Sequence, residues 1–221
     1  FTVPYEGGQG DADYRKWGPG YWWQNTRLPY IGMCTSGDFD LMRPLFKMYA
    51  DDLMSLFRHR TSVYFGHSGA FIPECICFWG DVFPHSYGWK PFEEREDKLQ
   101  SAGWHKWEWF SGPELVFMLL DYYDYTLDET FLAETVLPAA DEIIRFFDEH
   151  YQTDEHGQLF MHPSQALETW WDCTNPTPEI AGLHAITDRL LELPNPLVST
   201  DRRAYWEAFR NKLPAIPTIE V

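Results

Sequence analysis

Two consecutive apolar segments constrain the fold of this chain more than any other feature. In residues 112–126, "GPELVFMLLDYYDYT", every position from Leu115 to Leu120 is apolar, and a helix that is apolar all round is expected to be buried on all sides. In residues 128–151, "DETFLAETVLPAADEIIRFFDEHY", apolar side chains recur at helical spacing with acidic residues opposite, which predicts a helix buried on one side only. Because only a short link separates the two segments, they predict a two-layer arrangement with an inner and an outer helix.

The same periodicity predicts further helices before and after this pair. Residues 36–60 read as an amphipathic helix with Ser36 or Asp38 as N-cap, in which Pro44 either opens the regular part or kinks it. Pro138 is expected to kink the outer helix of the pair. Two more helices are expected in residues 176–193 and 199–213, the second capped by Ser199 or Thr200.

The segments between the helices give weaker signals. Residues 68–80, "SGAFIPECICFWG", fit a short helix or an extended run equally well. Residues 81–108 are rich in turn formers and charges and read as a long connection, which in compact domains is often functional. Residues 154–164 predict a turn followed by a short strand. We therefore expect one helical domain over residues 1–221.

Composition excludes several functional classes. The net charge of −17 disfavours nucleic acid and anionic lipid surfaces as partners, because phosphates would be repelled. There is no run of 18 apolar residues for a membrane span. The first residues, "FTVPYEGGQG", lack the features of a signal peptide, which leaves a cytosolic protein and a chain whose signal has been removed as alternatives. A neutral substrate is compatible with this charge.

Tryptophan clusters point to a sugar as that neutral substrate. The chain has 11 Trp, and several stand beside amides, carboxylates or His in "KWGPGYWWQN", "GWHKWEWF" and "ETWWD". Aromatic faces can stack on the C–H face of a sugar ring while polar neighbours bind its hydroxyls. A single Trp in such a cluster is also compatible with a purely structural role in the core.

The four cysteines suggest neither a metal site nor a disulfide framework. Cys75 and Cys77 are too close for the usual zinc pair and no second pair follows, so Cys34, Cys75, Cys77 and Cys173 are expected to be buried free thiols. No metal and no cofactor are expected.

The order of four segments resembles the catalytic domain of family 95 glycoside hydrolases. These segments are "WWQNTRLPYIGMCTSGDFDLMRPLF", "YFGHSGAFIPECICFWG", "LLDYYDYTLDETFL" and "HPSQALETWWD". The family comprises α-L-fucosidases and relatives with an (α/α)6 toroid, and the resemblance spans roughly residues 20–195, closest to a related bacterial branch. It implies an all-α, six-hairpin-type fold and a secreted or periplasmic enzyme acting on an oligosaccharide or polysaccharide.

The resemblance also assigns roles to individual residues. The family's general acid is the Glu of a "P-S-x-S-P-E-N" segment, which matches Glu168 in "PSQALET". The second Asn of its water-activating "N-x-N" pair matches Asn25, whereas Trp23 stands at the first. In the family's "G-W-x-x-H-H-N-T-D" region Glu74 stands where the first His is found, so a specificity for fucose is not carried over.

The resemblance leaves the general base unplaced. The family's base Asp lies downstream of the region matched here, and a complete toroid has twelve helices where about seven are expected in this chain. A missing C-terminal half, or a homo-oligomer that completes the ring, would account for both.

Local reasoning on the candidate residues leaves some alternatives open. Glu74, in an apolar run, either forms a buried salt bridge with Arg27 or Arg60 or contacts substrate. Glu114 is either a first-turn carboxylate favoured by the helix dipole or a pocket residue. His67 is either a hydrogen-bonded structural residue or part of the cavity.

The expected function is hydrolysis of a glycosidic bond by an inverting acid/base mechanism. The catalytic candidates are Glu168 as general acid and Asn25 as the residue that positions water. The expected substrate-binding residues are Trp22, Trp23, Gln24, Arg27, Tyr64, His67, Glu74, Trp79, Glu114, Gln165, Thr169 and Trp171. The alternatives are a carbohydrate-binding helical domain that lacks the base, and a structural module whose Trp clusters serve packing.

Overall fold

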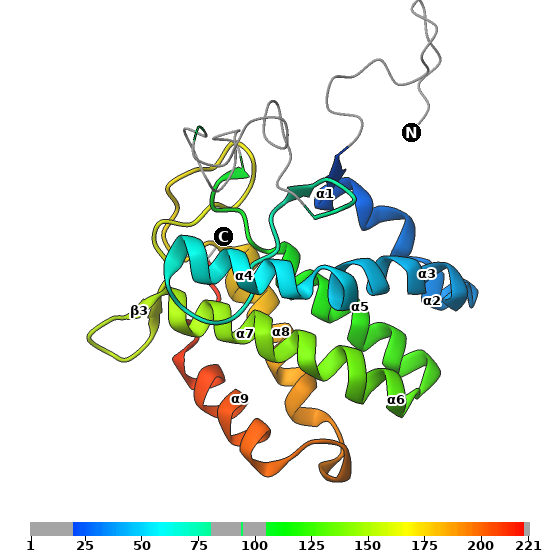
Figure 1. Cartoon of the computed structure of the whole chain (residues 1–221). Coiled ribbons are helices and arrows are strands. Elements are labelled where there is room, and N and C mark those ends of the chain that lie inside the picture. Colours follow the sequence, from blue (N-terminus) through cyan, green and yellow to red (C-terminus); the bar gives the residue numbers. More distant parts are fainter. Residues whose placement is uncertain (1–19, 81–93, 95–104, 219–221) are drawn as a thin grey trace, which may run out of the picture.

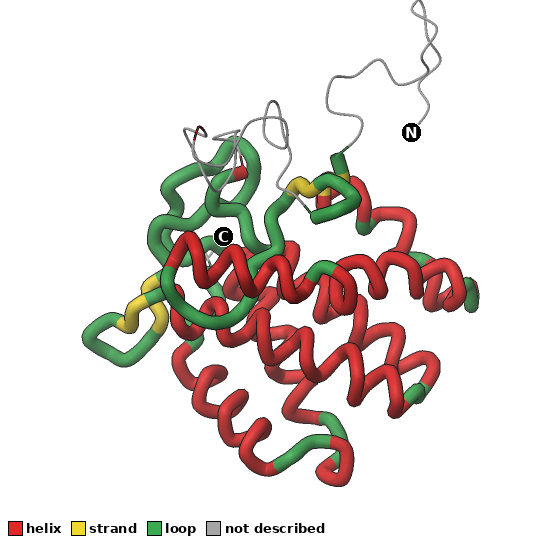
Figure 2. The backbone as a smooth tube through the Cα atoms, viewed as in Figure 1, coloured by secondary structure: helices red, strands yellow, loops and turns green. Residues whose placement is uncertain are grey.

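Helices form most of the molecule. The computed structural model describes residues 20–80, 94 and 105–218, and Figure 2 shows that helices make up the bulk of this part. The short N-terminal helices are α1 (Trp23–Thr26), the 3₁₀ turn Leu28–Tyr30 and α2 (Met33–Ser36). The helices that follow are α3 (Phe39–Phe46), α4 (Met54–Phe65), α5 (Ser111–Thr126), the three-residue α6 (Glu129–Phe131), α7 (Leu137–His150), α8 (Thr177–Glu192) and α9 (Thr200–Lys212), with a 3₁₀ turn at Asn195–Leu197.

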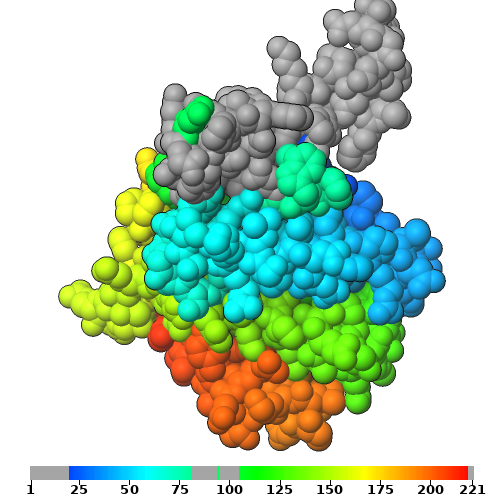
Figure 3. Space-filling model, viewed as in Figure 1, coloured from blue at the N-terminus to red at the C-terminus, as the bar shows by residue number. Residues whose placement is uncertain are grey.

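These helices lie in two layers, as the two apolar segments predict. Helices α4, α7 and α9 run as three bands across one face of the molecule (Figure 3). Helix α5 packs against both α7 and α8, and α8 packs against α9 (Figure 1). Helix α7 buries one stripe that includes Ile143, Ile144 and Phe147, so the expectation of a one-sided outer helix is confirmed.

The expectation that α5 is buried on all sides is wrong at one face. Leu115, Val116 and Leu119 are fully buried, but Phe117 is 39% exposed. The guanidinium of Arg189 on α8 lies 4.5 Å from the centroid of the Phe117 ring, an arrangement that favours a cation over the ring face. A run of apolar residues in the sequence does not predict the contact between Phe117 and Arg189, because the two residues are far apart in the chain.

The two helix prolines lie next to wide helical turns. Pro44 lies inside α3, which continues into the π-helical turn Lys47–Asp52, and Pro138 lies at the start of α7, directly after the π-helical turn Leu132–Val136. A proline removes one backbone donor and crowds the preceding turn, which at Pro138 is the wider π turn. The expected irregularity at both prolines is therefore local, and each helix continues past it.

The strands are short, and they form two antiparallel pairs in the segments between the helices. Residues 71–77 contain no helix, which rules out one of the two alternatives for this segment, and β2 (Cys75–Ile76) pairs antiparallel with β1 (Tyr21–Trp22). Strands β3 (Gln152–Thr153) and β4 (Leu159–Phe160) form the hairpin that follows α7. None of the helices in the described part is long and apolar enough to cross a membrane.

Candidate functional site

The pairing of β1 with β2 places Glu74 beside the N-terminal tryptophans. The amide of Trp23 donates to the carbonyl of Glu74 at 2.7 Å, and the amide of Gln24 donates to Oε1 of its carboxyl at 2.8 Å. The hydroxyl of Ser111, the first residue of α5, donates to Oε2 at 3.3 Å. Glu74 is fully buried. Of the two alternatives for Glu74, the salt bridge to Arg27 or Arg60 is not formed, since Arg27 pairs with Glu114 and Arg60 donates to the carbonyl of Gly80.

A second buried carboxyl lies close to Glu74. Glu108 accepts a hydrogen bond of 2.9 Å from Nε2 of Gln24 on Oε1, and its Oε2 lies 2.6 Å from Nδ1 of His105. Gln24 therefore donates to both acids, through its backbone to Glu74 and through its side chain to Glu108. Burial raises the pKa of Glu74 well above its usual value, and the charge of Glu108 raises it further.

Glu114 lies in the first turn of α5, and one of its carboxylate oxygens interacts with two side chains. Its Oε2 accepts a hydrogen bond of 2.7 Å from Nε1 of the buried Trp23 and lies 3.1 Å from Nε of Arg27. Burial raises the pKa of Glu114, and Arg27 and Trp23 oppose that rise because they favour the carboxylate. Both roles expected for Glu114, first-turn carboxylate and pocket residue, are present together.

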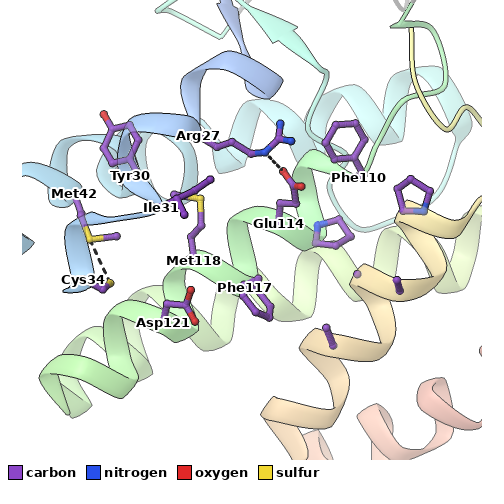
Figure 4. Close-up of a pocket in the computed structure, with 15 residues that line it drawn as sticks. Arg27, Tyr30, Ile31, Cys34, Met42, Phe110, Glu114, Phe117, Met118 and Asp121 are labelled. Carbon is purple, nitrogen blue, oxygen red and sulfur yellow. Dashed lines mark hydrogen bonds and ion pairs between the residues drawn. The ribbon is translucent and has the colours of Figure 1, made fainter. Parts of the chain in front are cut away.

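Arg27 and Glu114 lie in the wall of a pocket of about 400 Å³ between the short N-terminal helices, α5 and α8 (Figure 4). Most of its other lining is apolar, including Ile31, Phe110 and Met118. The pocket does not include Glu168, Asn25 or Trp22. Its walls therefore bring together only Arg27 and Glu114 of the expected site residues.

Glu168 lies at the tip of a turn and faces solvent. Leu167 and Trp170 form an antiparallel bridge on either side of Glu168 and Thr169, and backbone hydrogen bonds between Ser164 and Cys173 close the base of the loop. The Glu168 carboxyl makes no hydrogen bond or ion pair with any residue that the structure describes, whereas its carbonyl accepts from Nε1 of Trp171. The expected apolar surroundings of this acid are therefore not formed by the residues that the structure describes.

The rings beside Glu168 are also exposed. Trp170 is 65% and Trp171 49% exposed, and Thr169 is exposed as well. Free ring faces next to a carboxyl group are suited to contact a sugar, since stacking needs an accessible face. This loop, residues 164–173, is called the acid loop below.

The acid loop is connected to the tryptophan cluster through residues 105–109. Oε1 of the buried Gln165 accepts a hydrogen bond of 3.3 Å from the amide of Trp107, and its Nε2 donates to the carbonyl of Leu167 at 3.0 Å. One residue further along, Glu108 is held by Gln24. Segment 105–109 thus contacts both the acid loop and α1, which carries the exposed Asn25.

Three expected pocket residues have their described contacts elsewhere. Tyr64 packs against Phe65 and Phe71 in a ring cluster at the end of α4. Nε2 of His67 lies 3.0 Å from Nδ1 of His150, a contact of the kind that the structural alternative for this residue involves. Trp79 is 54% exposed and packs edge-on against Phe78. Most of the long connection at 81–108 lies outside the described residues.

Sequence reasoning missed three buried polar residues near this site. His105 and Glu108 stand three positions apart in the "GWHKWEWF" cluster, a spacing that could have suggested a pair. Glu179, in the first turn of α8, is fully buried, and neither carboxyl oxygen has a hydrogen-bond partner among the described residues. No local signal distinguishes Glu179 from a helix-capping acid.

The arrangement is capable of hydrogen bonding and proton exchange. Glu74, Glu114 and Glu179 all feel the charge of Glu108, which raises the pKa of each of them. Among the described residues, no group of three or more His, Cys, Asp or Glu side chains is placed to hold a metal ion. The four cysteines are free thiols, of which Cys173 is half-buried rather than buried as expected.

Comparisons with known proteins agree with the helical architecture. The chain is similar in structure to a chain described as "Putative kojibiose phosphorylase from human microbiome", with a TM-score of 0.61 and 11% sequence identity. The match covers 90% of this chain but only 26% of that protein, and at this identity it shows the fold alone, a helical toroid type. No curated protein matches the sequence.

The family comparison extends over most of the chain. Residues 15–214 match the family model described as "Glycosyl hydrolase family 95 catalytic domain". This range includes α1, segment 105–109 and the acid loop, so each part of the site described above lies within it. The chain therefore belongs to glycoside hydrolase family 95.

Proposed function

We propose that this chain supplies the acid side of an inverting glycoside hydrolase acting on a neutral oligosaccharide or polysaccharide. The observation that carries the proposal is the acid loop, in which the exposed Glu168 is followed by the exposed rings of Trp170 and Trp171 and which is hydrogen-bonded to segment 105–109. In this proposal Glu168 protonates the leaving oxygen and Asn25 positions water or a hydroxyl on the other side of the bond.

The exposure of Glu168 sets a condition on this chemistry. A general acid must keep its proton near neutral pH, which requires a site that disfavours the charged carboxylate. In this proposal a sugar stacked on Trp170 or Trp171 covers the carboxyl and excludes water from it, since both rings belong to the same loop as Glu168. Binding of the substrate then creates the surroundings in which the acid can keep its proton.

In this proposal the general base is not a residue of the sequence studied. We place it on a further helical segment, or on a second copy of the chain, that completes the ring. In support, the chain spans about a quarter of the length of the similar toroid structure.

Substitution of Glu168 by Gln tests the proposed role. Hydrolysis of unactivated oligosaccharides should fall about 10²- to 10⁴-fold, because proton transfer to the leaving oxygen is lost. Glycosyl fluorides, whose leaving group needs little protonation, should be cleaved at nearly the original rate. The matched control is Glu155→Gln, an exposed acid in the β3–β4 turn, which should change neither rate. Equal losses on both substrate types would contradict an acid role for Glu168.

The second candidate is a carbohydrate-binding domain without hydrolytic activity. The exposed rings of Trp170 and Trp171 favour it as much as they favour the enzyme, since stacking alone suffices for binding. Binding of oligosaccharides without any hydrolysis, in the assembly that completes the ring, would support this candidate over the first.

A further inference from the structure

We propose that the groove between α5 and α8 binds an α-helix from outside residues 1–221, with an apolar stripe and a basic residue on one flank. This inference rests on the proposed function, which places the general base on a further segment, and it names the surface that this segment covers. The groove is the pocket of about 400 Å³ that Arg27 and Glu114 border (Figure 4).

The groove lies on the faces of α5 and α8 that point away from the core. On α8, Leu183 and Ile186 are fully buried in the core. The small residues Ala181, Gly182 and Ala185 alternate with them at helical spacing, are half-buried and line the groove. Because small side chains add little bulk to a helix surface, a further helix can approach α8 closely along this face.

Large apolar side chains border the same groove and are accessible in the described part of the chain. Ile31, after the 3₁₀ turn, is 67% exposed, and Phe117 on α5 is 39% exposed. Accessible apolar side chains that lie together are typical of a contact surface for another polypeptide. The groove therefore has apolar walls contributed by two different parts of the chain.

The shape of the groove suits a helix. Helices α5 and α8 pack together and run in the same direction, since Gly182 faces Pro113 and, further along, Arg189 faces Phe117. The lining of α5 extends over residues 113–121, which at 1.5 Å per residue is roughly 12 Å, or about two helical turns. Two packed helices form a groove in which the side chains of a third helix can interdigitate.

The position of the groove matches the requirement of the proposed function. Segment 105–109 leads into the start of α5, and the acid loop leads into the start of α8. Phe110, Pro113 and Pro178 line the groove at this end. A helix that lies along the groove thus has one end next to the acid loop, where a segment that carries the general base is needed.

Charge favours a separate helix with a basic flank over a second copy of this chain. Arg27 and Glu114 balance each other at one end of the groove, whereas at the other end Arg189 pairs with both Asp121, at 2.7 Å, and Asp124, at 2.6 Å. Two carboxylates and one guanidinium leave a negative charge there, which a Lys or Arg of the partner complements. A second copy carries a net charge of −17 and is repelled.

Helical peptides measure whether the groove binds such a partner. The probes are two peptides of about 15 residues, cross-linked to hold them helical, with a stripe of Leu and Ala. They differ only in one flanking residue, which is Lys in one peptide and Glu in the other. The Lys peptide should bind the whole chain about two- to fivefold more tightly in calorimetric titration, because an exposed ion pair contributes little free energy.

Substitutions in the groove locate the binding. Ala185→Trp places an indole in the groove and should weaken binding of the Lys peptide about tenfold or more. The matched control is Ala208→Trp, at an exposed position of α9, which should bind like the unaltered chain. Ile31→Ser provides a second test at an exposed position that does not affect the core, and should weaken binding about threefold or more, because apolar contact area is lost.

Each outcome decides one claim. Absence of binding for both peptides, or full affinity in Ala185→Trp and Ile31→Ser, would overturn the inference. A Glu peptide that binds as tightly as the Lys peptide would overturn the basic flank. Sedimentation of the unaltered chain tests the other occupant: a dimer that Ala185→Trp dissociates would show that a second copy fills the groove.

The groove and the acid role can fail separately. Glu168→Gln should bind both peptides like the unaltered chain, because Glu168 does not line the groove. Peptide binding as predicted, together with hydrolysis that does not depend on Glu168 in the completed assembly, would overturn the proposed function and leave the docking surface standing.

Discussion

Nε1 of Trp23 lies 2.7 Å from Oε2 of Glu114, and this hydrogen bond joins α1 to α5. The two residues are 91 positions apart, and Arg27 pairs with the same oxygen at 3.1 Å. Trp23 is fully buried, so the indole donor has no access to water if the carboxylate is removed. Glu114 therefore ties the N-terminal segment that carries Gln24 and Asn25 to α5.

Substitution of Glu114 by Ala should destabilise the fold by about 2 kcal/mol. The change leaves a buried indole N–H and a partly buried guanidinium without their acceptor, and unpaired groups of this kind cost about 1–3 kcal/mol each before partial exposure is allowed for. Urea unfolding followed by tryptophan fluorescence measures the loss. Asp121→Ala is the control, since Asp121 pairs with Arg189 in a more exposed position on the same helix and should cost less than about 1 kcal/mol. Equal losses in the two variants would contradict a structural link through Glu114.

Two glycines after α4 should respond very differently to the same substitution. Gly66 and Gly69 both have positive φ, 75° and 87°, so alanine strains the backbone at either site. A Cβ at Gly66 meets nothing within 4 Å, whereas a Cβ at Gly69 would lie 2.2 Å from the backbone nitrogen of Phe146 on α7. Gly66→Ala should therefore cost about 1 kcal/mol and Gly69→Ala several times more, because α7 would have to move. Thermal melts of the two variants provide the comparison, and similar melting temperatures would contradict the close approach to α7.

The helices were predictable because their signals are local. The periodicity of residues 176–193 places Ile180, Leu183 and Ile186 on one face, and all three are fully buried in α8. The pair of an inner and an outer helix at α5 and α7 follows from the same kind of pattern. Helix bounds could be placed within a few residues, since caps such as Ser199, which accepts from the amide of Arg202, can be read from the sequence.

The site was predictable only in part, because its contacts are not local. Gln24 and Glu74 are both among the expected site residues and are hydrogen-bonded to each other, but the acid that Gln24 also contacts, Glu108, lies in a segment that reads as a connection. Glu168 was identified through a resemblance to a family, whereas its exposure depends on a turn that no periodicity reveals. Tyr64 and His67 are among the expected pocket residues. They lie at the end of α4, where Tyr64 packs against Phe71 and His67 packs against Phe65.

Acid should destabilise the molecule through His150. Burial, and secondarily the neighbouring His67, lower the pKa of His150 from 6.5 to about 4. Between these values the unfolded chain binds more protons than the folded one, so the free energy of unfolding should decrease as the pH falls from about 6.5 to 4. The full difference corresponds to about 3 kcal/mol. Denaturation at several pH values measures this slope.

A phenylalanine at position 150 provides the matched variant. His150 stacks on Phe146 with centroids 4.9 Å apart and planes at 16°, so His150→Phe keeps an aromatic ring in that place. The variant has no group that titrates there, and its stability should depend less on pH between 4 and 6.5. His156→Gln, at an exposed site, should retain the original dependence. An unchanged slope in His150→Phe would show that other groups cause the loss in acid.

Glu179 should have the opposite effect on stability. Burial raises the pKa of its carboxyl well above the usual value, and the charge of Glu108 adds to this rise. The amides of Glu179 and Trp109 face the carboxyl and offset part of the rise, although neither makes a hydrogen bond of good geometry. The folded chain therefore keeps a proton that the unfolded chain has lost, and the resulting stability is present at low pH and disappears as the pH rises through the folded pKa.

Glu179→Gln should remove this dependence, because an amide stays neutral at every pH. Near pH 4.5 and below, the variant and the unaltered chain should have similar free energies of unfolding. At pH 8 the variant should be more stable by about 1 kcal/mol or more, the value of one pKa unit of buried-charge cost. Glu155→Gln, in which the replaced acid is exposed, should follow the unaltered chain at both pH values. A Glu179→Gln chain that is less stable at pH 8 would indicate that the carboxylate is charged in the folded state and held by partners, and that the buried site at the start of α8 binds a positive group.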